Sequence, residues 1–246
     1  MKINPEKCIH CLECLDYCPM GAILEENEVV VIDQDECVEC GVCLRAEVCP
    51  VNAIYLPEES QKYPRSIRAA FSNVCVPHSE FKDRPKLNNR GRGTEEMKTN
   101  DVTGRYRKGE YGIALEFGRP GIGCKIAEIE KLTKIICSMN VQIEEDNPVY
   151  RLLEDPKTGS IKQEVLREKI LSAILEFKIK EHQLEQIVKT LIPILGQLDT
   201  VVSWGLITRF TEDGRLPVRS KLEELGIPSR PNAKMNLGLG RPIIEE

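Results

Sequence analysis

The sequence predicts an α+β protein in which a cysteine-rich N-terminal quarter precedes a β-α-β-β-α-β sandwich. Two observations predict this fold class. Eight of the eleven cysteines lie between positions 8 and 49, and apolar residues from position 110 onward alternate between strand-like and helix-like spacing. The 246 residues are 41% hydrophobic but only 5% aromatic, which is typical of small aliphatic cores in one large or two small domains.

The elements after residue 110 follow from the period of their apolar side chains. A period of two predicts a strand, and recurrence at every third and fourth position predicts a helix. In chain order we expect a strand over 111–117, a helix over 122–139, a strand over 141–144 that resumes at 149–153, a strand over 171–179, a helix over 184–195 with a kink at Pro193, and a strand over 200–210. This is the order of the split βαβ sandwich.

Changes in composition divide the chain into four segments. We expect a cysteine-rich domain over 1–56, a basic irregular connector over 57–109, the α+β domain over 110–212 and an extended C-terminal tail over 213–246. The connector is interrupted by glycine and proline, which predicts loop rather than regular structure.

The connector is basic in an acidic chain. It holds twelve Lys and Arg residues against seven Asp and Glu, a balance of +5, whereas the whole chain carries −5. A basic strip predicts docking on an acidic partner surface or on an anionic cofactor that the partner holds, and arginine suits contact with carboxylate or phosphate. The expected contacts are Arg90, Arg92, Arg105 and Arg107. The alternative is a solvated linker whose charges only keep it soluble.

Charge and hydropathy narrow the classes of function. The net charge of −5 disfavours nucleic acid as the main partner, because nucleic-acid-binding domains are usually basic. No apolar run is long enough to span a bilayer, and the first residues lack the apolar stretch of a signal peptide. We therefore expect a cytoplasmic protein with no membrane partner. In that reducing compartment, eleven cysteines indicate metal binding or redox chemistry rather than disulfides.

The eight N-terminal cysteines form two similar runs. The first run is Cys8-x2-Cys11-x2-Cys14-x3-Cys18-Pro19, and the second is Cys37-x2-Cys40-x2-Cys43-x5-Cys49-Pro50. Three thiolates spaced in this way can share one tight loop, and soft thiolate ligands suit iron–sulfur clusters or zinc. Zinc sites usually use pairs of Cys-x2-Cys units that lie far apart. The repeated triple followed by Cys-Pro therefore favours iron–sulfur clusters over the zinc alternative.

These two runs closely resemble those of the bacterial two-cluster ferredoxins. The resemblance covers residues 1–56, and it implies two [4Fe–4S] clusters and electron transfer at low potential. In that family the fourth cysteine of each run binds the other cluster. The resemblance therefore implies Cys8, Cys11, Cys14 and Cys49 as the ligands of one cluster, and Cys37, Cys40, Cys43 and Cys18 as the ligands of the other.

The second run departs from the simplest pattern, because residues 44–48 stand where three residues would suffice. We expect this insertion to bulge outward before Cys49 and to set the potentials of the two clusters apart.

Three cysteines lie outside the two runs, namely Cys75, Cys124 and Cys137. Cys137 fits a helix core. Cys75 is the strongest candidate of the three for a role, although an ordinary thiol is the favoured interpretation.

The residues over 119–123, Arg-Pro-Gly-Ile-Gly, lie between the first strand and the first helix of the expected α+β domain. This placement is similar to the loop of ACT-type ligand-binding domains, where an anion meets a helix N-terminus. The resemblance implies a small anionic ligand at Gly121–Gly123. The alternative, which the residues themselves favour, is a tight turn that requires glycine.

The expected function is low-potential electron transfer by a ferredoxin-like subunit of a cytoplasmic oxidoreductase. Its partner would be a catalytic subunit or another redox protein. No catalytic residue is predicted, because His10, His78 and His182 lie in no catalytic motif and no nucleotide-binding motif is present. Two alternatives stay open. One is a redox-linked sensor whose α+β domain binds a small molecule, and the other is a reductase with a substrate site on that domain.

Overall fold

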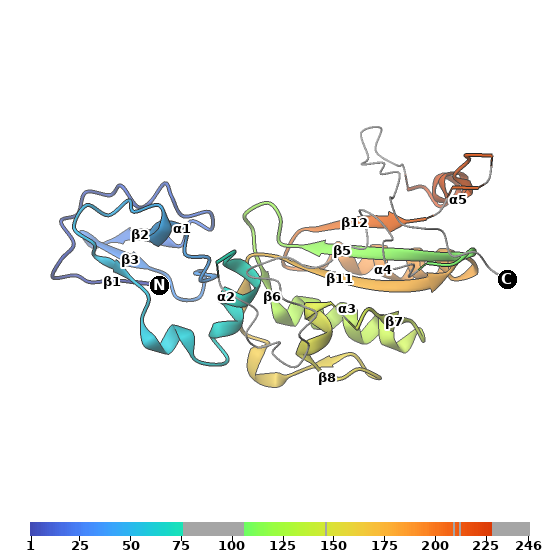
Figure 1. Ribbon diagram of the computed structural model, residues 1–246, viewed down its shortest axis with the longest axis horizontal. Coiled ribbons are helices and arrows are strands. Elements are labelled where there is room, and N and C mark those ends of the chain that lie inside the picture. Colours follow the sequence, from blue (N-terminus) through green and yellow to red (C-terminus); the bar gives the residue numbers. More distant parts are fainter. Residues whose placement is uncertain (76–105, 146, 209, 212, 228–246) are drawn as a thin grey trace.

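The computed structural model describes residues 1–75, 106–145, 147–208, 210–211 and 213–227. The expected contacts Arg90, Arg92 and Arg105 lie outside the described residues, as do His78 and most of the expected C-terminal tail. Figure 1 shows the cysteine-rich domain and the α+β domain side by side, with helix α2 (Ser66–Ser72) at their junction.

The cysteine-rich domain is built from two small antiparallel sheets. Strand β1 (Lys2–Ile3) pairs with β4 (Ile54–Tyr55) and joins the two ends of the domain. Strand β2 (Ile23–Glu26) forms a hairpin with β3 (Val29–Ile32). The cysteines lie in the loops between these strands and in the short helix α1 (Val42–Arg45). Apolar residues of the strands, among them Ile23, Val30 and Ile54, form a core beneath the loops.

The α+β domain contains a four-stranded antiparallel sheet in the order β12-β5-β11-β7. Its strands are β5 (Glu110–Phe117), β7 (Gln142–Ile143), β11 (Ala173–Lys180) and β12 (Val202–Ile207). Helix α3 (Ile126–Ser138) lies between β5 and β7 in the chain, and α4 (Leu184–Leu195), which contains Pro193, lies between β11 and β12. The main elements therefore follow the β-α-β-β-α-β order that the sequence predicts.

The core of this domain lies on one face of the sheet. Ile113, Leu115 and Phe117 alternate along β5 and are fully buried. The apolar faces of α3 and α4 cover them with Ile126, Ile129, Leu132, Ile136, Leu184, Ile187, Val188 and Leu191.

On the opposite face of β5, a Cβ atom at Gly112 would lie 2.3 Å from the hydroxyl oxygen of Tyr106. Glycine at that position therefore leaves the space that the buried Tyr106 ring occupies.

Two elements differ from the expectation. Helix α3 begins at Ile126 rather than at 122, because Cys124–Lys125 is extended as β6 and pairs with β10 (Lys169–Ile170). Residues 148–152 form a 3-10 helix, η3 (Pro148–Leu152), instead of a strand. Proline suits the first position of a helix, and the side chain of Asn147 accepts a hydrogen bond from the N–H of Val149. Residues 148–152 therefore form a capped helical turn, although the alternation of their apolar side chains predicts a strand.

The remaining elements of this domain are short. Strands β8 (Leu153–Asp155) and β9 (Ser160–Ile161) form a hairpin whose turn spans residues 156–159. The other short elements are η4 (Gln163–Val165) and η5 (Glu181–Gln183). Helix α5 (Pro217–Glu224) lies in the segment over 213–246 that we expected to be extended, so this expectation is wrong for residues 217–224.

Residues 57–75 differ from the irregular connector that composition predicts. They form the 3-10 helix η1 (Glu58–Gln61) and helix α2. Ile67, Ala70 and Phe71 of α2 are buried in the core of the α+β domain. The three positions have i, i+3, i+4 spacing, so they lie on one face of the helix. Helix α2 therefore belongs to the core of the α+β domain, although it follows the cysteine-rich domain in sequence.

Candidate metal centre

The eight cysteines of the two runs line two separate cavities. The first cavity contains Cys8, Cys11, Cys14 and Cys49, and the second cavity contains Cys18, Cys37, Cys40 and Cys43. Each has an empty volume of about 330 Å³, counting the part open to solvent. Three cysteines of each cavity come from one run and the fourth comes from the other run. The rest of each wall is mostly apolar, with Ile3 and Ile54 in the first and Met20 and Ile23 in the second.

Each cavity presents four thiols and a mostly apolar wall, which is the ligand type that an iron–sulfur cluster requires, since thiolates are the usual ligands of such clusters. Among the residues that the structure describes, no group of three or more His, Cys, Asp or Glu side chains could hold a single metal ion. The thiols are instead distributed around each cavity. This arrangement suits a cubane, in which each iron takes its own thiolate.

The fourth cysteine of each run has equivalent surroundings. The sulfur of Cys18 accepts a hydrogen bond from the N–H of Ala22 at 3.2 Å, and the sulfur of Cys49 accepts one from the N–H of Ala53 at 3.1 Å. Burial opposes ionisation of Cys49, but backbone N–H groups, led by that of Ala53, outweigh it and lower the pKa of its thiol. Hydrogen bonds to sulfur are one of the factors that set the potential of an iron–sulfur cluster.

The two cavities differ in their exposure. Cys37, Cys40 and Cys43 are buried, whereas Cys11 is exposed and the other three cysteines of the first cavity are partly exposed. Burial raises the pKa of the Cys43 thiol to about 11. Residues 44–47 of the insertion are exposed, which agrees with the expected outward bulge. The expected difference between the two potentials stays a prediction.

Arg68 of helix α2 connects the second cavity to the α+β domain. This side chain is buried, and its Nη1 donates hydrogen bonds to the carbonyl oxygens of Gln34, Asp35 and Cys37. Its Nε donates to the carboxylate of Glu168 in the α+β domain. One buried guanidinium therefore holds both the loop that leads to Cys37 and the neighbouring domain.

Further polar contacts secure the same junction. Arg45 donates from Nη1 to the carbonyl oxygen of Cys40 at 2.8 Å and to the side chain of Asn73, which ends α2, at 2.7 Å. Lys169 of β10 pairs with Glu36. These contacts, together with that of Arg68, hold α2 and β10 against the loops that carry the more buried set of cysteines.

Several N–H groups in the loop over 118–123 and at the start of α3 already have backbone acceptors. The N–H groups of Ile122 and Gly123 donate to the carbonyl oxygen of Gly118. The first N–H groups of α3, on Ile126 and Ala127, donate to carbonyl oxygens of residues 168 and 166. The small anionic ligand implied at Gly121–Gly123 is therefore not supported, because backbone carbonyls already occupy these donors.

The same loop instead packs against the cysteine-rich domain. A Cβ atom at Gly121 would lie 3.0 Å from the carbonyl oxygen of Pro19, and one at Gly123 would lie 2.7 Å from Cε of Met20. Both glycines have positive φ angles. Glycine thus allows a close approach to the residues that follow Cys18 and line the second cavity.

The other candidate residues lie away from both cavities. Cys124 is buried next to this junction, and burial raises the pKa of its thiol to about 12. Cys75 is exposed after α2, and Cys137 is partly buried in α3. His10 pairs with Glu25 at 2.9 Å on the surface. His182 lies in η5 of the α+β domain.

Sequence reasoning missed Arg68, Arg45 and Met20, which surround the second cavity. The sequence signal for α2 was the i, i+3, i+4 spacing of Ile67, Ala70 and Phe71. A helix of seven residues gives too short an apolar pattern to be recognised in a segment rich in proline and glycine.

No helix among the described residues is both long and apolar enough to cross a membrane.

Comparison with known proteins places the likeness in the N-terminal quarter. Residues 1–50 match the family model of the 4Fe-4S dicluster domain. The chain is 46% identical over 57 residues to pyruvate synthase subunit PorD of Methanothermobacter marburgensis, which is 23% of this chain and 64% of that protein. It therefore spans less than two thirds of the length of that relative.

Two ferredoxins match over a larger share of their own length. The identity is 39% over 78 residues with a ferredoxin of Saccharopolyspora erythraea, covering 29% of this chain and 72% of that protein. It is 38% over 65 residues with a ferredoxin of Alicyclobacillus acidocaldarius, covering 25% and 81%. No solved structure matches the chain.

Proposed function

Because this chain belongs through its first 50 residues to the 4Fe–4S dicluster ferredoxins, we propose that it is the electron-carrying subunit of a larger oxidoreductase. Its N-terminal domain holds two 4Fe–4S clusters and transfers electrons as ferredoxins do. When bound, each cluster takes up and releases electrons at a potential that its surroundings set. The likeness to pyruvate synthase subunit PorD supports a catalytic oxidoreductase subunit as the partner.

The grouping of the cysteines is the observation that carries the proposal. One cluster takes Cys8, Cys11, Cys14 and Cys49, and the other takes Cys37, Cys40, Cys43 and Cys18. The two cavities support these ligand sets, because each cavity combines three thiols of one run with the fourth thiol of the other. The prolines that follow Cys18 and Cys49 turn the chain away after each crossing ligand.

The α+β domain then serves as the scaffold that joins the carrier to its complex. A ferredoxin needs only residues 1–56, so the rest of the chain has another task. The strand order β12-β5-β11-β7 supports an ACT-like sandwich. The loop over 118–123 joins this domain to the cysteine-rich domain, because its glycines approach Pro19 and Met20.

Purification from the native source without oxygen tests this function. We expect the chain to co-purify with a catalytic oxidoreductase subunit and to become reduced when that subunit receives its own substrate. The Cys11→Ser variant should lose this reduction, and Cys75→Ser, which changes an exposed thiol outside both cavities, should retain it. A chain with intact clusters that purifies alone and accepts no electrons from such a subunit would contradict the proposal.

A further inference from the structure

We infer that the first cavity is the port at which a partner redox protein exchanges electrons with this chain, and that this partner presents a basic rim around an apolar centre. The inference rests on the proposed electron-transfer function. It adds which of the two cysteine sites the partner meets and what kind of protein surface it carries.

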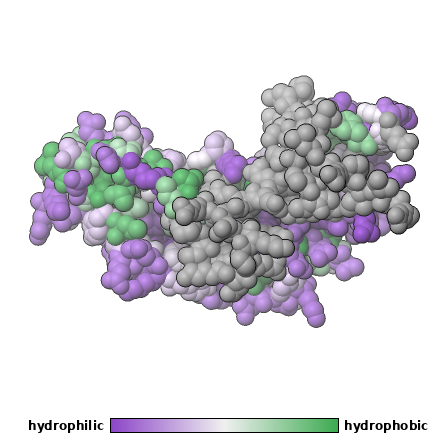
Figure 2. Space-filling model, in the orientation of Figure 1, coloured by the Kyte–Doolittle hydropathy of each residue, from purple (hydrophilic) through white to green (hydrophobic). Residues whose placement is uncertain are grey.

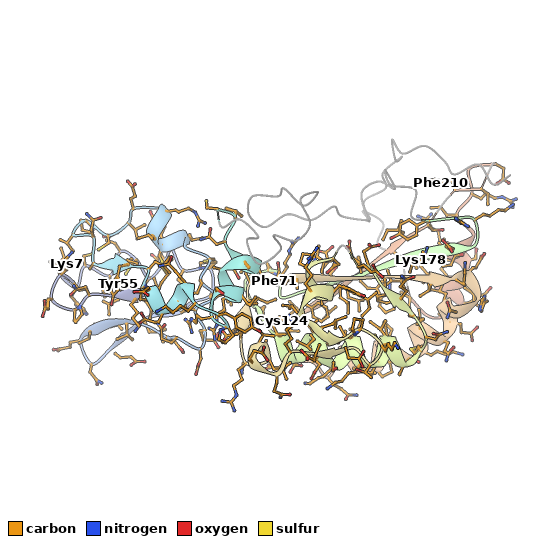
Figure 3. All side chains as sticks on the ribbon, turned by 60° about the horizontal axis from the view of Figure 1, so that its bottom comes forward. Lys7, Tyr55, Phe71, Cys124, Lys178 and Phe210 are labelled. Carbon is orange, nitrogen blue, oxygen red and sulfur yellow. The ribbon has the colours of Figure 1, made fainter. Side chains whose placement is uncertain are left out.

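The second cavity is covered by the chain itself. Arg68, Lys169 and the loop that contains Gly123 all reach the residues around Cys18 and Cys37. Figure 3 shows Phe71 and Cys124 at this junction, whereas Lys7, the neighbour of Cys8, lies at the opposite end of the cysteine-rich domain. The first cavity therefore faces the free end of the molecule.

Apolar side chains around the first cavity are exposed where the cysteines are closest to the surface. Ile9 is 60% exposed and Leu12 is 36% exposed, and both line the first cavity beside the exposed Cys11. Figure 2 shows hydrophobic residues gathered on the surface of this domain among hydrophilic ones. Exposed apolar residues in the wall of a redox site are typical of a contact centre between proteins.

Acidic residues surround this apolar centre. Glu6 and Glu13 are exposed on the loop of the first run, and Glu25 is brought to the same loop by its 2.9 Å pair with His10. Residues 1–56 contain eleven Asp and Glu against three Lys and Arg, a balance of −8. One of the three, Lys2, is paired with Glu59. Charge complementarity therefore requires a basic partner face, because an acidic one would be repelled.

The direct test compares two isoleucines that carry the same substitution. Ile9→Lys adds a positive charge at the first cavity. Ile122→Lys adds it to a residue that is 50% exposed, in the loop whose glycines approach Pro19 and Met20 of the second cavity. The cluster-loaded full chain is titrated with a basic c-type cytochrome as the probe. We expect Ile9→Lys to weaken binding on the order of tenfold and Ile122→Lys to leave it unchanged.

A second pair separates charge from loss of the apolar contact. Glu13→Lys reverses a charge at the first cavity, and Glu154→Lys makes the same change at an exposed position of β8 in the α+β domain. We expect only Glu13→Lys to weaken binding and to reduce its dependence on salt. Hydrogen exchange should show protection by the cytochrome over residues 6–14 and not over 118–123.

The outcomes distinguish this inference from the proposed function. Equal weakening by Ile9→Lys and Ile122→Lys, or protection at 118–123, would overturn the port assignment while leaving electron transfer intact. A cluster-loaded chain that binds the cytochrome at residues 6–14 but never reduces it would overturn the proposed function instead. Visible and EPR spectra that match those of the unmodified chain show that each variant still holds its clusters.

Discussion

Arg68 donates a hydrogen bond from Nη1 to the carbonyl oxygen of Cys37 at 2.8 Å, and this bond joins helix α2 to the loop of the second cavity. The same guanidinium pairs with Glu168 of the α+β domain. One buried cation is thus shared by the cysteine-rich domain and its neighbour. We expect the two domains to depend on each other for stability, although each has a separate hydrophobic core.

Replacing Arg68 with Met should destabilise the chain by about 3–5 kcal/mol, because Glu168 is left nearly buried without its cation. The loss should be seen as a lower melting temperature by circular dichroism and as earlier bleaching of visible absorbance. The matched control is Arg215→Met, which removes an exposed arginine paired with Asp213. A melting temperature that falls equally in both variants would show that Arg68 has no special role at the junction.

Replacing Phe71 with Ala should destabilise the α+β domain by about 3–5 kcal/mol, because a large buried side chain leaves a cavity in its core. Trp204, the single tryptophan of the chain, lies on β12 and reports unfolding of this domain by its fluorescence. Val74→Ala is the control, since Val74 is exposed just past α2. If Phe71→Ala unfolds at the same denaturant concentration as the unmodified chain, α2 does not belong to this core.

The sequence predicts the strands and helices of the α+β domain well, because their apolar periods are long. The grouping of the cysteines in the two cavities is the one that the resemblance to the two-cluster ferredoxins implies, and it does not follow from the spacing of the runs alone. The sequence does not predict the role of α2, because Phe71 is buried in a core whose other members outside α2 are forty or more positions away, so its burial depends on tertiary contacts. A fragment that begins at residue 110, where the sequence places the domain, would lack Phe71.

The contacts of the loop at Gly121–Gly123 could not be predicted from the sequence for a similar reason. Its glycines are visible in the sequence, but the carbonyl groups that occupy the nearby N–H donors come from residues 118, 166 and 168. The approach of Met20 to Gly123 likewise depends on how the domains pack. Local sequence shows that a turn is present there, whereas its contacts require the folded chain.

Replacing Cys18 with Ser should damage the cluster of the second cavity and spare that of the first, because Cys18 lies with Cys37, Cys40 and Cys43. Iron analysis and EPR spectra of the anaerobic protein measure the result. Cys75→Ser should leave both signals unchanged. Selective loss of the signal that depends on Cys8, Cys11 and Cys14 would mean that the fourth ligands do not cross.

Stability of the α+β domain should fall in acid through Glu110. Burial would raise the pKa of this carboxyl, but Lys180, the N–H of Arg107 and Lys178 outweigh it and lower the pKa from 4.5 to about 2. Because the folded pKa is the lower one, this stabilisation is complete above pH 4.5 and is lost as the pH falls toward 2.

Denaturation followed by Trp204 fluorescence at several pH values tests the Glu110 prediction. Glu110→Gln should be less stable than the unmodified chain near neutral pH, and the difference should shrink below pH 4.5. Glu154→Gln, at an exposed position, provides the control. A difference that stays constant over the whole pH range would show that the ion pairs of Glu110 contribute nothing measurable.

The content and potential of the metal centres test the central claim most directly. The chain is purified without oxygen, its iron, acid-labile sulfide and zinc are counted, and its EPR signals are followed during a redox titration. We predict about eight irons and eight sulfides per chain and two low-potential signals. Two zinc ions with no sulfide, or iron that cannot be reduced, would contradict electron transfer through two 4Fe–4S clusters.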